Sequence, residues 1–449
     1  MNNMNTPVCD FVKEYKNKNT LRLHMPGHKG ESLLGFEDMD ITEIKGADSL
    51  YEAEGIIAES EKNASELFGC DTCYSTEGSS QCIRAMLYLI SLYAKSKNEP
   101  CRILAARNVH KTFLSGAALL DIDVSWWYAS KDSGYLSATI PPNELDEYLR
   151  SADDKKPTAL YITSPDYLGK TADIKGLSEI CRKHGVLLAV DNAHGAYLRF
   201  LPESRFPTDL GADMCCSSAH KTLPVITGGA YLHLNATLPR LLVENAKKAL
   251  SLFGSTSPSY LILQSLDKAN EYLSASYKKD LASFIGRVRE LKEKLINHGY
   301  TLYGDEELKL TVAAKAYGYR GIDFADILRK SNIEIEFADP DFAVMMLTPG
   351  LSSENLLYME KTLLSIEKRS AITEKMPETS KHETAVSIRE AMLSQSETVK
   401  AEKCAGRILA ESSVGCPPAV PIVMCGEIIE ESDTETFRYY GIEYCSVIK

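Results

Sequence analysis

The chain has 449 residues, of which 44% are hydrophobic, so it is long enough for two to four domains with a large core. Fifty basic and sixty-two acidic residues give a net charge of −12, which argues against a nucleic-acid-binding surface. No apolar run approaches the ~18–20 residues of a membrane span, and the N-terminal segment lacks the apolar region of a signal peptide, so we expect a cytoplasmic protein. The cysteines, several of them in apolar runs such as Cys215-Cys216, are typical of reduced intracellular thiols. The Cys70/Cys73 pair has no second pair at zinc spacing, so no metal site is predicted.

Helices and short apolar strands alternate along the first half of the chain. Thr6-Pro7 predicts the start of a helix that runs to about residue 18, and further helices are predicted over 59–68, 81–95 and 177–184. Strands are predicted at 103–106, 160–163, 186–190 and 213–217. Continuous apolar runs of this kind suit a parallel sheet covered on both faces, which predicts an α/β fold.

The second half indicates two further domains. A long helical stretch, 258–298, leads to a smaller α/β pattern with strands at 308–313, 333–337 and 344–347 and a helix at 321–331. Pro349-Gly350 precedes a last helix. The polar, charged stretch 370–382 predicts a linker to a C-terminal domain.

Two of the predicted strands deliver charged residues to one edge of the sheet. Asp191 closes the strand 186–190, and Lys221 follows the strand 213–217. Ligands of parallel sheets bind beyond the carboxyl ends of the strands. Pyridoxal 5′-phosphate (PLP) needs a lysine amine for its Schiff base and a carboxylate for its ring nitrogen. The pair therefore predicts a PLP site, although either residue alone is more commonly a cap or a solvated side chain.

A third feature fits an anion. Gly78-Ser79-Ser80 opens the helix over 81–95, and a helix N-terminus presents backbone N–H groups to a phosphate. Alone this signal is weak, because a serine before a helix is usually only a cap.

These motifs together resemble the Orn/Lys/Arg decarboxylase family of fold-type I PLP enzymes. The matching stretches are D-N-A-H-G-A-Y at Asp191, S-S-A-H-K-T-L-P at Lys221, HMPGHKG at residues 24–30, R-N-x-H-K at His110, S-T-S-P-S-Y at Thr256 and the tail G-R-I…G-E, so the resemblance spans nearly the whole chain. It implies that Lys221 is the Schiff-base lysine, that Asp191 meets the ring nitrogen and that His110 stacks on the ring. His194 and His220 are candidates for proton handling, or are purely structural. The predicted catalytic residues are Lys221, Asp191, His194 and His220, and the predicted cofactor contacts are Gly78, Ser79, Ser80, His110, Ser164, Asp191, His194, Ser218, His220, Lys221 and Thr256.

The resemblance also implies the architecture. We expect a fold-type I transferase fold with an N-terminal arm (1–45), a large, mainly parallel seven-stranded PLP-binding domain (46–275), a small α/β domain (276–370) and a C-terminal α+β domain (371–449). The arm and the 255–257 segment are expected to lie against a partner subunit, so a homodimer or higher homo-oligomer is predicted. The chain departs from the family pattern at Glu77, Asp166, Cys416 and Ala419.

The implied reaction is decarboxylation of arginine, lysine or ornithine to the amine, as in polyamine biosynthesis. The alternatives are another fold-type I enzyme, such as an aminotransferase or a lyase, and a non-catalytic homologue, which the complete cofactor set argues against. A distal substrate cation needs a counter-charge. Glu427 is the first candidate, with an exposed glutamate at the start of a strand as the alternative interpretation; Glu77, Asp166 and Asp48 are the next candidates.

Overall fold

The computed structural model describes residues 4–128, 135–152, 155–416 and 420–449. It divides into two compact units. The first contains Met1–Pro100 and Leu187–Ala282, and the second contains Cys101–Val186 and Ser283–Lys449. Each unit is described by itself.

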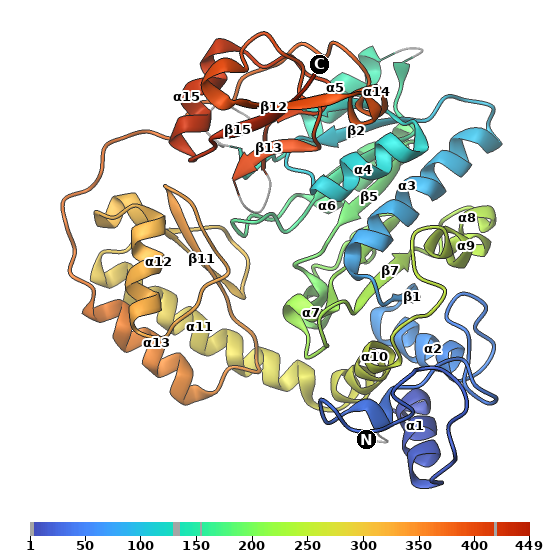
Figure 1. Ribbon diagram of the computed structural model, residues 1–449. Coiled ribbons are helices and arrows are strands. Elements are labelled where there is room, and N and C mark those ends of the chain that lie inside the picture. Colours follow the sequence, from blue (N-terminus) through green and yellow to red (C-terminus); the bar gives the residue numbers. More distant parts are fainter. Residues whose placement is uncertain (1–3, 129–134, 153–154, 417–419) are drawn as a thin grey trace. The chain divides into compact units, whose positions relative to one another are not determined.

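The first unit is built on four strands in the order β1-β7-β6-β5, with bounds β1 (Asp71–Ser75), β5 (Leu187–Asp191), β6 (Met214–Ser217) and β7 (Ala230–Leu234) (Figure 1). β5 and β6 are parallel, whereas β7 runs antiparallel to both β6 and β1. Every residue of β5, β6 and β7 is buried. This burial explains why these strands are apolar throughout instead of alternating.

The helices of this unit pack around those strands. They are α1 (Pro7–Asn17), α2 (Ile56–Phe68), α3 (Gly78–Ser96), α7 (Ala219–Thr222), α8 (Arg240–Glu244), α9 (Ala246–Ser251) and α10 (Tyr260–Tyr272), with a π-helical turn at Leu273–Tyr277. α3 contacts all four strands of the unit. α2 ends at Gly69, which has φ +72° and so closes the helix in the left-handed conformation that glycine favours.

The second unit begins with three parallel strands in the order β4-β2-β3, with bounds β2 (Arg102–Ala106), β3 (Asp123–Trp127) and β4 (Ala159–Thr163). Its helices here are α4 (Lys111–Leu120), α5 (Pro142–Ser151) and α6 (Ile174–His184). β2 and β4 are largely buried, as expected for strands covered on both faces.

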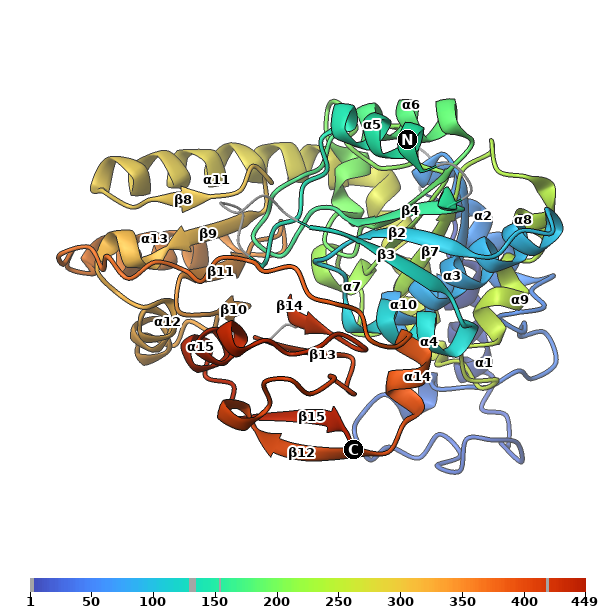
Figure 2. The same cartoon turned by 90° about the horizontal axis from the view of Figure 1, so that it is seen from above.

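Two further parts complete the second unit. An antiparallel sheet has the order β10-β11-β9-β8, formed by β8 (Leu302–Tyr303), β9 (Lys309–Ala313), β10 (Phe337–Ala338) and β11 (Phe342–Met346). Its helices are α12 (Gly321–Lys330), α13 (Ser353–Ser365) and α11 (Lys278–His298), of which the part from Ser283 onward belongs to this unit. The C-terminal part has the antiparallel pairs β12 (Ser396–Lys400) with β15 (Tyr444–Ile448) and β13 (Ser413–Cys416) with β14 (Val420–Met424), plus α14 (Ile388–Leu393) and α15 (Glu431–Tyr439) (Figure 2). Its core includes Leu409, Ile422, Phe437 and Val447.

The predicted fold class is confirmed: the protein is α/β with a mixed, mostly parallel sheet, and the seven strands expected of the large domain are found, four in one unit and three in the other. Four of these seven strands were predicted, whereas β1, β3 and β7 were not among the predicted ranges. The predicted strand at 333–337 retains only Phe337. The domain boundaries stay a prediction, and Ala419 lies outside the described residues. Among the described residues, no helix is long and apolar enough to cross a membrane.

Candidate active site

Asp191 is the last residue of β5 and lies beside Cys216 of the neighbouring parallel strand β6. Its side chain is buried, with 2% of the residue exposed. Oδ1 accepts a hydrogen bond from the Ala193 N–H at 3.1 Å, and the Cys216 thiol lies 3.5 Å from the same oxygen. The carboxylate is therefore held at the carboxyl end of the sheet in surroundings with little water, where its interaction with a cation is strengthened.

Lys221 reaches the same region from α7, the short helix that follows β6. Its Nζ lies 3.0 Å from Nε2 of His194, a buried histidine three residues after Asp191. Gly195 makes this turn possible, because an added Cβ would lie 2.0 Å from Oδ1 of Asn192. The structure thus brings His194 against the predicted Schiff-base amine.

His220 is arranged differently. Its backbone N–H donates to the Gly229 carbonyl at 3.2 Å, and its Nδ1 lies 3.1 Å from the same oxygen. The ring is therefore fixed on the loop before β7 through its Nδ1–H. Of the two histidines predicted for proton handling, His194 is the one in contact with Lys221.

The N-terminus of α3 is tied to the lysine segment. Ser218, which precedes α7, donates from Oγ to Ser79 Oγ at 2.7 Å. Gly78 has φ +72°, and its N–H donates to the Gly228 carbonyl at 2.7 Å. That N–H is therefore already used within the protein, and the glycine serves the turn by its conformation. Ser79 and Ser80 are half-buried in the first turn of the helix.

Gln81 supports this turn and was missed by the sequence analysis. Its Oε1 accepts from Ser75 Oγ at 2.5 Å, and its Nε2 donates to Tyr51 OH at 2.7 Å and to the Leu250 carbonyl at 2.8 Å. Gln81 is 1% exposed. The sequence did contain a signal for Gln81, because it is an amide residue on the amphipathic helix predicted over 81–95.

The residues present fit PLP. A primary amine on Lys221 suits the aldehyde, the Asp191 carboxylate suits a protonated ring nitrogen, and the first turn of α3, with Ser79 linked to Ser218, suits the phosphate. All of these groups belong to the first unit. Thr256, also of this unit, is exposed.

Two predicted cofactor contacts, His110 and Ser164, belong to the second unit. His110 is the N-cap of α4: its Nδ1 accepts the N–H of Thr112 at 3.2 Å, so the neutral ring carries its proton on Nε2. Ser164 is buried after β4, and its Oγ accepts the Ala172 N–H at 3.0 Å.

Glu427 is neither a carboxylate available to the substrate nor an exposed residue at the start of a strand. It is 1% exposed and lies after β14, not at the start of an exposed strand. Its Oε1 and Oε2 accept hydrogen bonds from the two terminal nitrogens of Arg107 at 2.6 and 2.7 Å. Burial opposes the charge of Arg107, yet the hydrogen bonds to Glu427 raise its pKa above the usual value. Because both carboxylate oxygens are held by an internal cation, the prediction of Glu427 as the substrate's counter-charge is wrong.

Of the three other candidates for binding the substrate's distal cation, two already accept hydrogen bonds within the protein. Asp48 accepts backbone N–H groups through both oxygens, among them those of Gly55 and Ile57 at the start of α2. Asp166 is 3% exposed and accepts the Lys170 N–H at 2.8 Å, and burial raises its pKa. Glu77, immediately before α3, is exposed.

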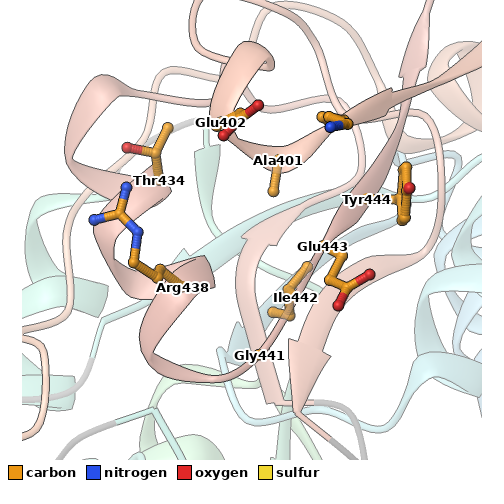
Figure 3. Close-up of a pocket in the computed structure, with 9 residues that line it drawn as sticks. Ala401, Glu402, Thr434, Arg438, Gly441, Ile442, Glu443 and Tyr444 are labelled. Atoms are coloured by element: carbon orange, nitrogen blue, oxygen red, sulfur yellow. The ribbon is translucent and has the colours of Figure 1, made fainter.

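A cavity of about 390 Å³ in the C-terminal part of the second unit has mixed charges, Lys400 and Arg438 against Glu402 and Glu443 (Figure 3). In Figure 3 the Arg438 side chain comes from α15 and Glu443 lies next to β15. None of the predicted site residues lines this cavity.

Comparison with known proteins places this geometry in a family. The family model of the Orn/Lys/Arg decarboxylase major domain matches residues 6–355, and that of the Orn/Lys/Arg decarboxylase C-terminal domain matches residues 367–443. The chain belongs to the Orn/Lys/Arg decarboxylase family. It is thus a PLP-type amino-acid decarboxylase, as the sequence motifs predicted.

Individual relatives agree with this assignment. The chain is 27% identical to an arginine decarboxylase of Bacillus subtilis (strain 168), over 96% of this chain and 93% of the relative, and 28% identical to an arginine decarboxylase of Halalkalibacterium halodurans, over the same shares. Among solved structures, lysine decarboxylase A from Pseudomonas aeruginosa has a TM-score of 0.82 at 16% identity, covering 99% of this chain and 81% of that one. The Francisella novicida lysine decarboxylase has a TM-score of 0.81, also at 16% identity and with the same coverage. These two structures show the shared fold.

Proposed function

We propose that this Orn/Lys/Arg decarboxylase family member removes the α-carboxylate of a basic amino acid, with arginine as the first substrate to test. The observation that carries the proposal is the delivery of Asp191 and Lys221 to the carboxyl ends of β5 and β6 within a matching family domain. Arginine is preferred because curated relatives that align along almost the whole chain are arginine decarboxylases. The amine product is of the class that polyamine biosynthesis consumes.

The chain's own residues divide the work. Lys221 would hold the cofactor's aldehyde, Asp191 its ring nitrogen, and the first turn of α3 its phosphate. When bound, PLP supplies an electron sink for the electron pair that the departing carboxylate leaves behind. The buried Asp191 carboxylate would keep a proton on the ring nitrogen of the bound cofactor, because a desolvated carboxylate interacts strongly with a nearby cation.

His194 and Lys221 form the proton-handling pair. With Nζ and Nε2 3.0 Å apart, a proton can pass between the amine and the imidazole. We therefore assign return of a proton to the substrate Cα to this pair, and a positioning role to His220, whose Nδ1 is occupied by the Gly229 carbonyl.

The substrate's distal cation still needs a carboxylate. Asp48, Asp166 and Glu427 are engaged by backbone N–H groups or by Arg107. Glu77 is the exposed candidate that remains, and it directly precedes α3. We assign Glu77 this role, which Glu77→Gln tests: KM for the basic substrate should rise about tenfold or more, with kcat nearly unchanged. An unchanged KM would exclude Glu77.

The proposal as a whole is tested by product analysis. The PLP-loaded protein is incubated with arginine, lysine or ornithine, and the products are identified by mass spectrometry. Release of carbon dioxide with the matching amine is expected, fastest with arginine. Formation of a keto acid instead would favour an aminotransferase, and the absence of any turnover would favour a non-catalytic homologue.

A further inference from the structure

The Arg107–Glu427 ion pair joins two segments of the second unit that are 320 residues apart in sequence. Each terminal nitrogen of the guanidinium donates to one carboxylate oxygen, and the side chains of the two residues are 8% and 1% exposed. Arg107 Nη2 also donates to the Ile422 carbonyl at 3.1 Å. This two-pronged arrangement fixes orientation as well as distance.

Glu427 is itself rigidly held on the C-terminal side. Its Oε2 accepts the N–H of Met424 at 2.8 Å, and its carbonyl accepts the N–H of Leu409 at 3.0 Å. The preceding Gly426 has φ +90°, and a Cβ there would lie 2.4 Å from the Val386 carbonyl. The Gly426-Glu427 turn therefore holds the Glu427 carboxylate in one position.

A buried histidine, His382, lies next to the Arg107–Glu427 pair and contacts a second carboxylate, that of Asp433. His382 Nδ1 lies 3.3 Å from Arg107 Nη2 and 3.6 Å from Glu427 Oε2. Its Nε2 lies 3.0 Å from both oxygens of Asp433, on α15. Tyr128 covers the guanidinium, with Arg107 Cζ 4.8 Å from its ring centroid.

On the other side, Arg107 directly precedes the segment that carries His110. It follows the last residue of β2, and its N–H donates to the Trp127 carbonyl at 3.2 Å. Three residues later His110 caps α4. The C-terminal part also holds the far end of that helix, since Arg389 of α14 donates to the carbonyls of Ala118 and Leu119 at 3.1 and 3.2 Å.

We propose that Arg107 and Glu427 are positioning residues: the C-terminal part of the chain uses this pair to fix the direction in which the segment 107–113 presents His110. Stability alone gives little reason for such a pair, because burying two charges costs about as much as their attraction returns. What a bidentate ion pair adds is a fixed orientation of the two side chains relative to each other. The role of His110 at the cofactor rests on the proposed function, whereas the fixing of the segment does not.

The test compares Glu427→Gln with Glu397→Gln. Glu397 forms an exposed ion pair with Arg407 at 2.7 Å in the same C-terminal part, so it is the matched control. Amide hydrogen exchange is measured by mass spectrometry on peptides covering 107–120, without and with PLP. The dissociation constant of PLP and kcat are then measured on the same preparations.

Glu427→Gln should speed exchange over 108–113 about tenfold, weaken PLP binding about tenfold and lower kcat, while Glu397→Gln should match the parent protein in all three. Unchanged exchange over 108–113 in a folded Glu427→Gln protein would overturn the proposal. If Glu427→Gln does not fold, Arg107→Lys replaces it, because lysine keeps the charge but cannot donate to both carboxylate oxygens at once. Arg107→Lys should raise the amide exchange rate of the same peptide by a smaller factor. An exchange rate equal to that of the parent protein would again overturn the proposal. Exchange is read without substrate, so a parent protein with no decarboxylase activity would count against the proposed function and leave this test intact.

Discussion

At the residue scale, Lys221 has the clearest assignment, since its amine is the group expected to attach PLP. Lys221→Ala should abolish the covalent, borohydride-reducible attachment of the cofactor and its visible absorbance. Lys248→Ala, an exposed lysine of α9, is the control and should behave as the parent protein. Mass spectrometry after borohydride reduction gives the result directly. A Lys221→Ala protein that still carries reducible PLP would mean that another lysine is the anchor.

Asp191 is tested by removing its charge while keeping its shape. Asp191→Asn should leave PLP bound but slow turnover, because a neutral amide does not keep a proton on the ring nitrogen. Loss of one charge-assisted hydrogen bond costs about 1.5–3 kcal/mol, or roughly one to two decades in rate. Steady-state kcat at saturating PLP is the measurement. Asp71→Asn, an exposed residue of β1, is the control, and equal kcat in the two variants would remove Asp191 from its assigned role.

These same residues show which kind of information a single sequence carries. Asp191 was predictable because it ends an apolar run, and Lys221 because it lies in the short segment that follows the next such run. The error over Glu427 had a different origin: its partner, Arg107, is 320 residues away, and nothing in either local sequence indicates the pairing. Long-range ion pairs need the tertiary structure.

At the element scale, the start of α2 depends on one buried carboxylate. Asp48 accepts the N–H groups of Glu54 and Gly55 at 3.1 and 2.8 Å and those of the first residues of the helix. Burial alone would raise the pKa of Asp48, but these backbone hydrogen bonds lower it below its usual value. The side chain thus works as a cap for α2 from eight residues upstream.

Asp48→Ala should therefore destabilise the protein by about 1.5–3 kcal/mol at pH 7, the range for hydrogen bonds to a charged group. A lowered folded pKa means that this stabilisation is fully present above the unfolded value of about 3.9 and is lost as the pH falls through the folded pKa. The difference from the parent in urea unfolding should keep its neutral-pH size down to about pH 4 and should shrink as the pH falls further. Glu52→Ala, exposed in the same loop, should show no such difference. A pH-independent loss would point to packing instead of charge.

The elements also show where local patterns stop being informative. α1, β5 and β6 were predicted within one or two residues, because a cap or an apolar run marks them. β7 was missed because the helix before it, α7, has only four residues, so the strand–helix spacing that marks the parallel strands is absent there. The predicted strand at 333–337 shrank to Phe337 because, among the strands that the structure describes, β10 pairs with β11 alone and over two residue pairs.

At the scale of the whole molecule, the N-terminal arm leaves apolar side chains uncovered. Leu21, Leu23, Met25, Leu33 and Leu34 are 80%, 84%, 66%, 84% and 77% exposed in the single chain. Such a concentration of apolar surface is typical of an interaction site. The exposed 255–257 segment belongs to the same unit. We propose that a second copy of the chain covers the arm in a symmetric homodimer, in which both partners use the same surface.

Replacing both Leu33 and Leu34 by Glu should then shift the protein toward a monomer. Burying one leucine contributes about 1.5–3 kcal/mol, and two carboxylates at the same contact add a desolvation cost, so dissociation should become easier by several orders of magnitude. Sedimentation velocity across a dilution series measures the shift, and Ile296→Glu, at a 54% exposed position of α11, is the control and should remain dimeric. Decarboxylase activity should fall in parallel with the dimer fraction, because the arm and the 255–257 segment are proposed to complete the neighbouring site. A monomeric Leu33→Glu/Leu34→Glu protein with parent-like kcat would show that each chain carries a complete site of its own.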